Sequence, residues 1–324
     1  MTTKLKVSSE SWELAKPFTI SRGTKTAADV VIVELTDEDG TRGWAECVPY
    51  PRYGETIDGV MDDIKAYGGS LNRAELNATM PSGAARNAMD CALWDLEAKR
   101  AGKRVWELAD LPEPVPTITA ETIGIGDPET MAEAARDLAQ APLLKVKLNT
   151  EKVITRMAGI RENAPDARLI IDPNESWDIE LLKEVAGPLA DLGVEMIEQP
   201  LALSKDHALA GYDCPVPLCA DESCHTVDKL PQLKDRYQMI NIKLDKTGGL
   251  TEAIELVQGG QELGFGIMIG CMVGTSLGMA PATLLGTYAK FVDLDGPLLM
   301  KKDRDHGLDF TGGKAHPPLA ALWG

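Results

Sequence analysis

Two lysines stand one residue apart in a mostly apolar stretch, LLKVKLNT, at 143–150. Side chains alternate between the two faces of a β-strand, so a strand here would point Lys145 and Lys147 in the same direction. A second stretch, MINIKLDK at 239–246, begins with an apolar run that ends at Lys243. Burying an ammonium group costs free energy, and desolvation lowers its pKa. These three lysines are therefore candidate functional residues.

Acidic residues take the equivalent place at the ends of the apolar runs between those lysines: Asp172, Glu198 and Asp221. The intervals from Lys147 through these residues to Lys243 are 25, 26, 23 and 22 residues, so each unit supplies one ionisable group. A single strand-end aspartate is often only a helix cap, but three carboxylates in register favour a shared site. Three hard oxygen donors suit Mg²⁺. Zinc is disfavoured because no histidine falls among the candidate ligands.

The order of these residues along the chain suggests a reaction. Lys147 precedes the predicted metal ligands and Lys243 follows them, so the lysines would flank a substrate bound at the metal. A metal-bound carboxylate stabilises the enediolate that forms when the α-proton leaves. Two bases on opposite faces can then remove a proton on one side and return it on the other, which is epimerisation. Salt bridges between the lysines and the carboxylates are the competing interpretation, and they do not exclude catalysis. Asn174 and Glu222 lie next to the ligands in sequence and are candidates to orient them.

The elements that would position these groups begin after residue 112. Strands alternating with helices predict parallel βαβ units, and eight such units with apolar strands predict a closed barrel. An open doubly wound sheet is the alternative, but no Gly-rich phosphate turn follows the first run. Barrel enzymes build their active sites at the C-terminal ends of the strands, where the charged residues fall. The eight runs are TITA (117–120), LLKVK, RLIID, VEMIE, VPLCAD, MINIK, GIMIG and KFVDLD.

The chain before residue 112 shows an α+β pattern. Two strands are predicted over 29–49, joined around Asp39 and Gly40 in a hairpin signal. An amphipathic helix is predicted over 84–102, with Gly102 as its C-terminal cap. LPEPVP at 111–116 is a predicted linker.

Composition limits the partners. The formal net charge of −17 argues against a nucleic-acid or anionic-membrane surface, because both require a basic patch. We expect no signal peptide and no membrane span, and the six cysteines fit a reducing cytoplasm. Cys214, Cys219 and Cys224 are evenly spaced, but the spacing differs from the usual zinc motifs, which favours small hydrophobic roles. The oligomeric state is left open, with a homo-oligomer among the alternatives.

The chain resembles the enolase superfamily and, within it, the muconate-lactonising subgroup. KVK at 145–147, the three acidic residues and IKLD with Lys243 match the family pattern one by one. The resemblance implies an α/β fold, a (β/α)7β TIM-like barrel with an N-terminal α+β capping domain. The cap would span 1–112 and the catalytic barrel 113–310, and a C-terminal tail at 311–324 would return to the cap. It also implies Mg²⁺ and a lysine base, with Lys145 assisting by neutralising the substrate carboxylate.

Dipeptide epimerases are the members of this subgroup that the chain resembles most. Their Asp-x-Asp motif on the eighth strand is similar to Asp293 and Asp295, which would bind the α-ammonium of a dipeptide. Arg22, in the loop predicted at 18–26, would bind a side-chain carboxylate, and Thr122, expected after the first strand, would lie near it. The segment at 51–56 would form a second loop at the mouth. The alternatives are a simple turn for the aspartates and a solvated loop cation for Arg22.

The resemblance therefore implies an isomerase, an L-Ala-D/L-Glu-type dipeptide epimerase with a small dipeptide substrate, serving murein peptide metabolism in the cytoplasm. Within the subgroup, N-acylamino acid racemase and o-succinylbenzoate synthase are the alternatives. A catalytically idle barrel that only binds peptides is an alternative of a different class, and the intact pair of lysines speaks against it.

Overall fold

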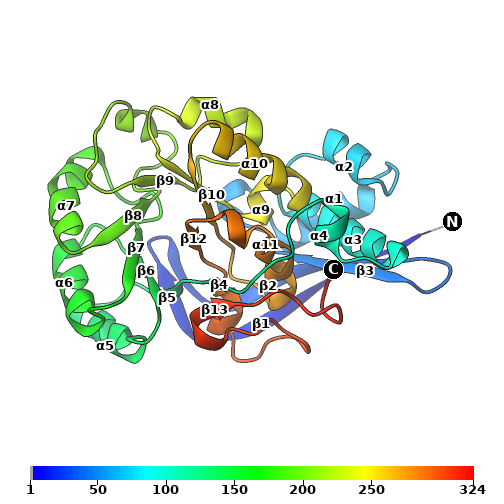
Figure 1. Ribbon diagram of the computed structural model, residues 1–324, viewed down its shortest axis with the longest axis horizontal. Coiled ribbons are helices and arrows are strands. Elements are labelled where there is room, and N and C mark those ends of the chain that lie inside the picture. The colour runs from blue at the N-terminus through cyan, green and yellow to red at the C-terminus, as the bar shows by residue number, and fades with distance from the viewer. Residues whose placement is uncertain (1–2) are drawn as a thin grey trace.

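The computed structural model describes residues 3–324, arranged as an antiparallel sheet with helices beside a parallel barrel (Figure 1). The barrel and its N-terminal α+β cap confirm the predicted fold class. No helix within 3–324 is both long enough and apolar enough to cross a membrane.

The cap contains a three-stranded antiparallel sheet in the order β1-β2-β3. The hairpin predicted over 29–49 is confirmed, because Thr36 pairs with Arg42 across the turn that contains Gly40. The helix predicted over 84–102 is confirmed as α3, and Gly102 ends it at a φ of 59°. The cap elements are β1 (Lys4–Ile20), β2 (Gly23–Thr36), β3 (Arg42–Cys47), η1 (Pro51–Tyr53), α1 (Ile57–Ala66), α2 (Arg73–Thr79), α3 (Ala84–Ala101) and α4 (Val105–Leu108).

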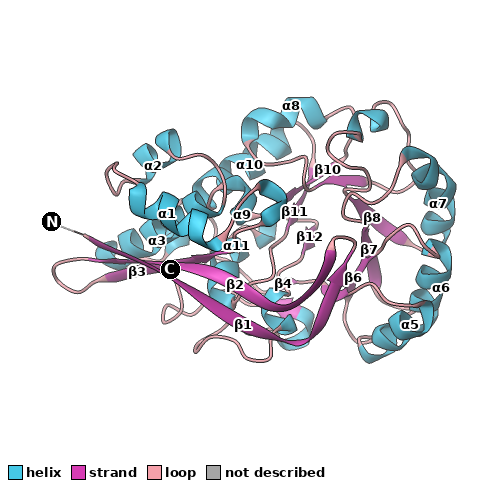
Figure 2. Cartoon of the chain, turned by 180° about the vertical axis from the view of Figure 1, so that it is seen from behind, coloured by secondary structure: helices cyan, strands magenta, loops and turns pink. Residues whose placement is uncertain are grey.

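The predicted loop at 18–26 is wrong, because these residues belong to strands. β1 and β2 pair almost to their ends, with Ile20 opposite Gly23, and only Ser21 and Arg22 form the turn. The ribbon they make extends from the cap to the barrel (Figure 2). Most of β1 is half-buried or exposed, so its sequence lacks the alternation of apolar and polar residues that marks a strand with one buried face.

Eight parallel strands form the barrel sheet in the order β5 to β12. The ends of this sheet meet where Thr119 bridges Val292 and Ala120 N donates to the Val292 carbonyl at 2.8 Å. The strands are β5 (Glu121–Ile123), β6 (Leu143–Lys147), β7 (Arg168–Asp172), β8 (Val194–Glu198), β9 (Leu218–Ala220), β10 (Met239–Ile242), β11 (Gly266–Ile269) and β12 (Phe291–Val292).

The predicted position of the first barrel strand, 117–120, is wrong. Thr117 and Ile118 form β4 (Thr117–Ile118), which pairs antiparallel with β13 (Lys314–Ala315), and the barrel strand begins only at Glu121. The run is therefore divided: Thr117 and Ile118 pair with β13 near the end of the chain, and Thr119 and Ala120 contact the last barrel strand, just before β5 begins.

Helices surround the barrel strands (Figure 1). α5, α6, α7 and α10 follow the strands as the alternation of patterns predicts. The helices and 3-10 turns after the cap are α5 (Pro128–Asp137), α6 (Val153–Asn163), α7 (Ile179–Asp191), η2 (Asp206–Leu209), η3 (Val227–Lys229), α8 (Leu230–Leu233), α9 (Leu244–Thr247), α10 (Leu250–Glu262), α11 (Ser276–Thr283), η4 (Gly286–Tyr288), η5 (Gly296–Leu299) and η6 (Thr311–Gly313).

The end of the chain packs on the cap helix α3. Trp323 is fully buried and its Nε1 donates to the Cys91 carbonyl at 3.2 Å. The backbone amide of Gly324 donates to Asp95 Oδ1 at 2.7 Å. Helix α3 is thereby held both by its own sheet and by the terminal residues.

Candidate active site

Side chains that point into the barrel form two successive layers, an apolar core layer and a layer of polar and charged residues. Each strand, or the chain just before it, contributes one residue to a buried apolar cluster inside the barrel. The members are Ala120, Leu143, Ile170, Met196, Cys219, Met239, Met268 and Phe291. Two residues further along, the same inward face carries a polar or charged side chain at or just after seven of the eight strands, because side chains repeat with a period of two. Those seven are Thr122, Lys145, Asp172, Glu198, Asp221, Asn241 and Asp293.

The lysines contact the acidic residues from both sides of this layer. Lys147 Nζ lies 2.6 Å from Asp172 Oδ2, at the β6–β7 side. Lys243 Nζ, at the end of β10, lies 2.6 Å from Asp221 Oδ2 and 3.6 Å from Glu198 Oε1. The two lysines therefore approach the acidic group from opposite sides, as the sequence predicts.

Lys145 lies deeper than Lys147 and is almost fully buried. Its ammonium donates to Asp293 Oδ2 at 2.7 Å and lies 2.6 Å from Glu198 Oε2. Burial lowers the pKa of Lys145, but the charges of Asp293, Glu198 and Asp172 outweigh it and hold the pKa well above its ordinary value. Lys145 therefore acts as a fixed positive charge in the site.

Opposing effects also set the charges of Lys243 and Asp221. Burial disfavours the charged form of each residue. Their mutual attraction outweighs burial, and Lys246 further stabilises the charged form of Asp221. As a result the pKa of Asp221 lies well below its ordinary value and that of Lys243 well above it. The salt bridges that the sequence offered as a competing interpretation therefore exist, and they keep the carboxylate of Asp221 ionised and ready for a cation.

The acidic residues fit a metal ion. Asp172, Glu198 and Asp221 each offer one oxygen, and these oxygens lie within 4.8 Å of one another. Glu198 Oε2 and Asp221 Oδ1 are buried and have no hydrogen-bond partner within 3–324, although lysine ammonium groups lie close to them. The ammonium groups offset the buried negative charge, and the oxygens keep lone pairs that can bind a metal ion. A set of carboxylate oxygens without histidine suits a hard cation such as Mg²⁺ or Na⁺ better than zinc.

The two residues expected to orient the ligands lie differently. Asn174 donates through its backbone N to Asp172 Oδ1 at 2.8 Å and through Nδ2 to Asp172 Oδ2 at 2.9 Å. Glu222 instead lies 2.9 Å from Arg22 Nη1. Burial and the nearby charges of Asp221 and Asp172 raise the pKa of Glu222 to about 8. Glu222 therefore belongs to the rim beside Arg22 as much as to the ligand cluster.

Two site residues escaped the sequence analysis. Asn241 precedes Lys243 by two positions on β10, and its Nδ2 donates to Glu198 Oε1 at 2.7 Å. Lys246 is fully buried on the short helix α9, with its ammonium 2.7 Å from Asp221 Oδ1. Strand alternation was enough to find Asn241. No comparable signal marks Lys246, because α9 interrupts the alternation.

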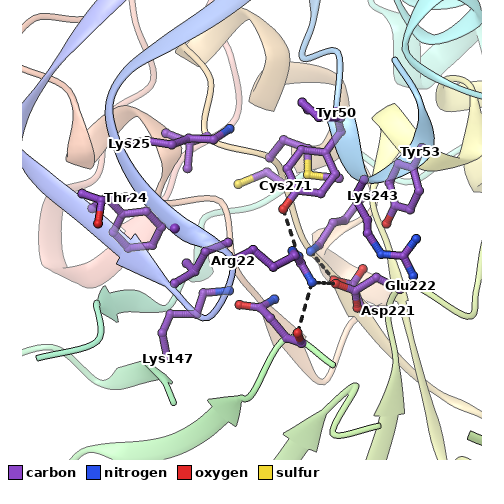
Figure 3. A pocket seen from close by; sticks show the side chains of 18 residues that line it. Arg22, Thr24, Lys25, Tyr50, Tyr53, Lys147, Asp221, Glu222, Lys243 and Cys271 are labelled. Atoms are coloured by element: carbon purple, nitrogen blue, oxygen red, sulfur yellow. Dashed lines mark hydrogen bonds and ion pairs between the residues drawn. The ribbon is translucent and has the colours of Figure 1, made fainter. Parts of the chain in front are cut away.

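A cavity of about 430 Å³ opens above the charged layer (Figure 3). Cap residues of the ribbon tip and of η1 line one side, and Lys147, Asp221 and Lys243 line the other. The cap and the barrel therefore enclose this space together.

Arg22 reaches from the ribbon turn across this cavity (Figure 3). Its Nη2 donates to the Tyr50 hydroxyl at 2.9 Å, and its Nη1 donates to the Asn174 carbonyl at 3.2 Å. The same nitrogen lies 3.5 Å from Glu175 Oε2. The side chain is only 26% exposed, so Arg22 is not a freely solvated loop cation.

Asp293 and Asp295 follow β12, and both are buried. Asp293 Oδ1 and Asp295 Oδ2 have no hydrogen-bond partner among the described residues. Burial and the charge of Asp293 raise the pKa of Asp295 to about 7. The backbone does turn here, with Leu298 N donating to the Asp295 carbonyl at 2.9 Å. That turn uses neither carboxylate, so one oxygen of each, Asp293 Oδ1 and Asp295 Oδ2, remains available to a ligand.

Thr122 lies within β5, opposite Lys145, and not after the first strand as expected. Its hydroxyl and backbone amide bond Asp295 and oppose the rise in the pKa of that residue. Thr122, Asp293 and Asp295 therefore form one group near Lys145. None of these three residues lines the cavity that Arg22 lines.

Comparison with known proteins places this geometry in a family. Residues 2–109 match the model of the mandelate racemase/muconate lactonizing enzyme N-terminal domain, and residues 129–318 match the enolase C-terminal domain-like model. The L-Ala-D/L-Glu epimerase of Escherichia coli strain K12 is 48% identical, over 96% of this chain and 99% of its own. An N-acetyl-D-glutamate racemase from a Pseudoalteromonas species is 46% identical, over 91% of this chain and 95% of its own.

A solved structure agrees with these relatives. An enolase family member from Agrobacterium tumefaciens, with homology to dipeptide epimerases and with sodium and L-Ala-L-Glu bound, superposes with a TM-score of 0.96. It is 49% identical, and the match covers 100% of both chains. The resemblance found in the sequence is confirmed, and the chain belongs to the mandelate racemase/muconate lactonizing enzyme family of the enolase superfamily.

Proposed function

We propose that this protein is a Mg²⁺-dependent dipeptide epimerase that inverts the C-terminal residue of L-Ala-Glu. The observation that carries the proposal is the placement of Lys147 and Lys243. They stand on opposite sides of the acidic cluster and line the same cavity. Two ammonium groups in that arrangement suit a reaction in which a proton leaves one face of a carbon atom and returns to the other.

The three acidic residues would hold the metal, and the bound cation would supply positive charge beside the substrate carboxylate as its α-proton leaves. Lys147 and Lys243 act in turn as base and acid, one on each face of the α-carbon. Each must be neutral when it accepts the proton, and a nearby cation favours the neutral form. Lys145, buried and held by carboxylates, keeps its proton and offsets the negative charge that builds up on the substrate.

Each end of the dipeptide would bind protein groups whose charge is opposite to its own. Asp293 and Asp295 offer buried carboxylate oxygens without donors, which suits the free α-ammonium. Arg22 offers a guanidinium that lines the cavity, which suits the side-chain carboxylate of glutamate.

N-acetylglutamate racemisation is the second candidate. The 46% identical N-acetyl-D-glutamate racemase favours it. So does the buried setting of Asp295, whose raised pKa leaves part of the population neutral near pH 7. A neutral carboxyl group has less attraction for an ammonium group.

The decisive experiment compares Ala-Glu with N-acetyl-Ala-Glu and N-acetylglutamate in D₂O with Mg²⁺, following deuterium at the α-carbon by mass spectrometry. We expect the free dipeptide to be preferred. We also expect acetylation to harm the wild type far more than an Asp293→Asn, Asp295→Asn double variant, because only the wild type loses a charge partner. A preference for N-acetylglutamate would replace the dipeptide assignment with the racemase.

A role in murein peptide metabolism, a cytoplasmic location and a homo-oligomeric assembly remain predictions from the sequence. The proposed partner is a small dipeptide, and the net charge of −17 gives no reason to add a nucleic acid or an anionic membrane.

A further inference from the structure

Five cationic side chains line the cavity, and four of them have a carboxylate partner within 4.0 Å. Arg22 pairs with Glu222, Arg52 with Glu175, Lys147 with Asp172, and Lys243 with Asp221. Lys25 lines the same cavity, and no ion pair or hydrogen bond of its side chain is found among residues 3–324. Lys25 is therefore the one of these five cations that has no carboxylate partner among the described residues, and this difference needs an explanation.

The ribbon aims Lys25 into the cavity. Lys25 lies on β2 opposite Phe18 of β1, and Phe18, Ile20 and Gly23 line the cavity with it. Residues at a spacing of two share one face of a strand, so this face of the ribbon forms a wall of the cavity. Figure 3 shows the Lys25 side chain extending toward Tyr50.

Lys25 and Arg22 both lie near the aromatic ring of Tyr50. The Lys25 ammonium lies 5.4 Å from the centroid of the Tyr50 ring, and the Arg22 guanidinium carbon lies 5.7 Å from it. Burial and the positive charge of Arg22 disfavour the Lys25 ammonium, and only Asp29 opposes them, so the pKa of Lys25 is lowered. An anion placed between the two cations would relieve both effects.

Arg22 is poorly suited to bind that anion alone. Glu222 and Glu175 already face its Nη1, and Tyr50 occupies its Nη2. A further carboxylate at Arg22 would meet the repulsion of ionised Glu175, whereas at Lys25 it would meet an ammonium that has no carboxylate within 4.0 Å among the described residues. Phe18 and Ile20 border the site, and apolar neighbours strengthen a charge pair by excluding water.

We infer that Lys25 is a specificity-determining residue, which binds the side-chain carboxylate of a glutamyl substrate from the ribbon wall while Arg22 closes the opposite side. The inference deepens the proposed function and rests on it for the reaction that reports it. It concerns only the acidic side chain, which N-acetylglutamate shares with Ala-Glu.

The test uses paired substrates that differ only in side-chain charge: Ala-Glu against Ala-Gln, and N-acetylglutamate against N-acetylglutamine. Exchange of the α-proton in D₂O gives kcat/KM for each substrate with wild-type protein, Lys25→Met and Lys25→Arg. Lys16→Met is the matched control, because Lys16 is an exposed lysine of the same ribbon that does not line this cavity. The ratio of kcat/KM for the acidic and amide substrates is the readout, since partial misfolding lowers both values equally.

We expect Lys25→Met to reduce the preference for the acidic substrate about 10- to 30-fold, less than a fully buried pair because Lys25 is partly exposed. Lys25→Arg should restore most of the preference, and Lys16→Met should leave it unchanged. An unchanged preference in Lys25→Met overturns the assignment of Lys25 while the epimerase stands. Failure of the wild type to exchange the α-proton of any of the four substrates overturns the proposed function, and the inference falls with it.

Discussion

Lys147 and Lys243 both follow apolar strands, but their surroundings differ. Lys147 contacts Asp172, whereas Lys243 is held between Asp221 and Glu198 and faces Lys246 across the Asp221 carboxylate. The two proposed acid/base groups therefore have different surroundings, although each would carry out the same proton transfer on its own face of the α-carbon.

Replacing either lysine should stop epimerisation but leave residual exchange of the α-proton in one epimer. Which epimer still exchanges should depend on which lysine is replaced. We expect Lys147→Ala and Lys243→Ala each to lose about 10²- to 10⁴-fold in turnover, because each group is needed once per inversion. The remaining lysine can still exchange the α-proton of the epimer that it faces. Deuterium incorporation into L-Ala-L-Glu and L-Ala-D-Glu, measured separately, should therefore favour opposite epimers in the two variants. Equal residual exchange of both epimers in both variants would contradict the placement on opposite faces.

Metal binding depends on one residue in particular. Asp221 is kept ionised by Lys243 and Lys246, so Asp221→Asn should weaken Mg²⁺ binding by roughly 10- to 100-fold or more. Calorimetric titration with Mg²⁺ measures this directly, and a parallel titration with Na⁺ tests selectivity for the divalent ion. Asp191→Asn, at an exposed position of α7, is the control. Removal of divalent ions with EDTA should abolish turnover of the wild type, and full activity in metal-free buffer would refute the metal requirement.

The sequence predicted the residues that strand geometry places. Lys145, Lys147 and Asp172 stand at or near the ends of apolar strands. There the period of two specifies the direction of the side chain, and the repeating βα unit specifies its level along the barrel axis. Lys25 and Lys246 could not be found in this way. Lys25 reaches the cavity only because a long ribbon crosses from the cap, and Lys246 only because α9 turns its side chain back toward Asp221.

At the scale of elements, the barrel was easier to predict than the cap. Strands that are buried on both faces appear as continuous apolar runs, and seven of the eight predicted barrel strands overlap the observed ones. β1 is largely polar and is stabilised by pairing along β2. Cross-strand pairing of this kind leaves little periodic signal in one strand alone, so the ribbon that carries Arg22 was predicted as a loop.

The cap helix α3 meets the barrel at a pair of glycines before α10. Gly249 has a φ of 115°, and an added Cβ would lie 2.5 Å from Asp90 Oδ2. Asp90 cannot move aside easily, because Thr251 donates to it through its backbone N at 2.9 Å and its hydroxyl at 2.6 Å. This element contact therefore depends on the absence of a side chain.

Gly249→Ala should destabilise the fold by roughly 2–4 kcal/mol, combining backbone strain with a steric clash. Gly264→Ala is the matched control: its φ of 79° is also positive, but open space surrounds its Cβ position, so about 1 kcal/mol is expected. Urea denaturation followed by circular dichroism measures both. Similar losses in the two variants would mean that the contact with Asp90 is not tight.

At the scale of the whole molecule, catalysis requires the cap and barrel to stay docked, because the cavity takes its walls from both. Asp245, two residues after Lys243, forms part of that docking. Its Oδ1 accepts hydrogen bonds from Val48 N at 3.0 Å and from Asn87 Nδ2 at 2.8 Å, both in the cap. Burial raises the pKa of Asp245 from 3.8 to about 7, although these two hydrogen bonds oppose the rise.

The docking contact should therefore make stability depend on pH. A carboxyl group whose pKa is higher in the folded state holds its proton more tightly there, so its contribution is fully present below pH 3.8 and is lost as the pH rises through about 7. Between these limits the free energy of unfolding should fall by up to about 1.4 kcal/mol per pH unit from this one group. Asp245→Asn keeps the oxygen acceptor and removes the titration, so its stability should fall less steeply over the same range. Urea unfolding at intervals from pH 4 to pH 7.5, in EDTA to exclude metal binding, compares the slopes, with exposed Asp166→Asn as the control. If wild type and Asp245→Asn lose stability in parallel, Asp245 does not hold its proton at the junction of cap and barrel.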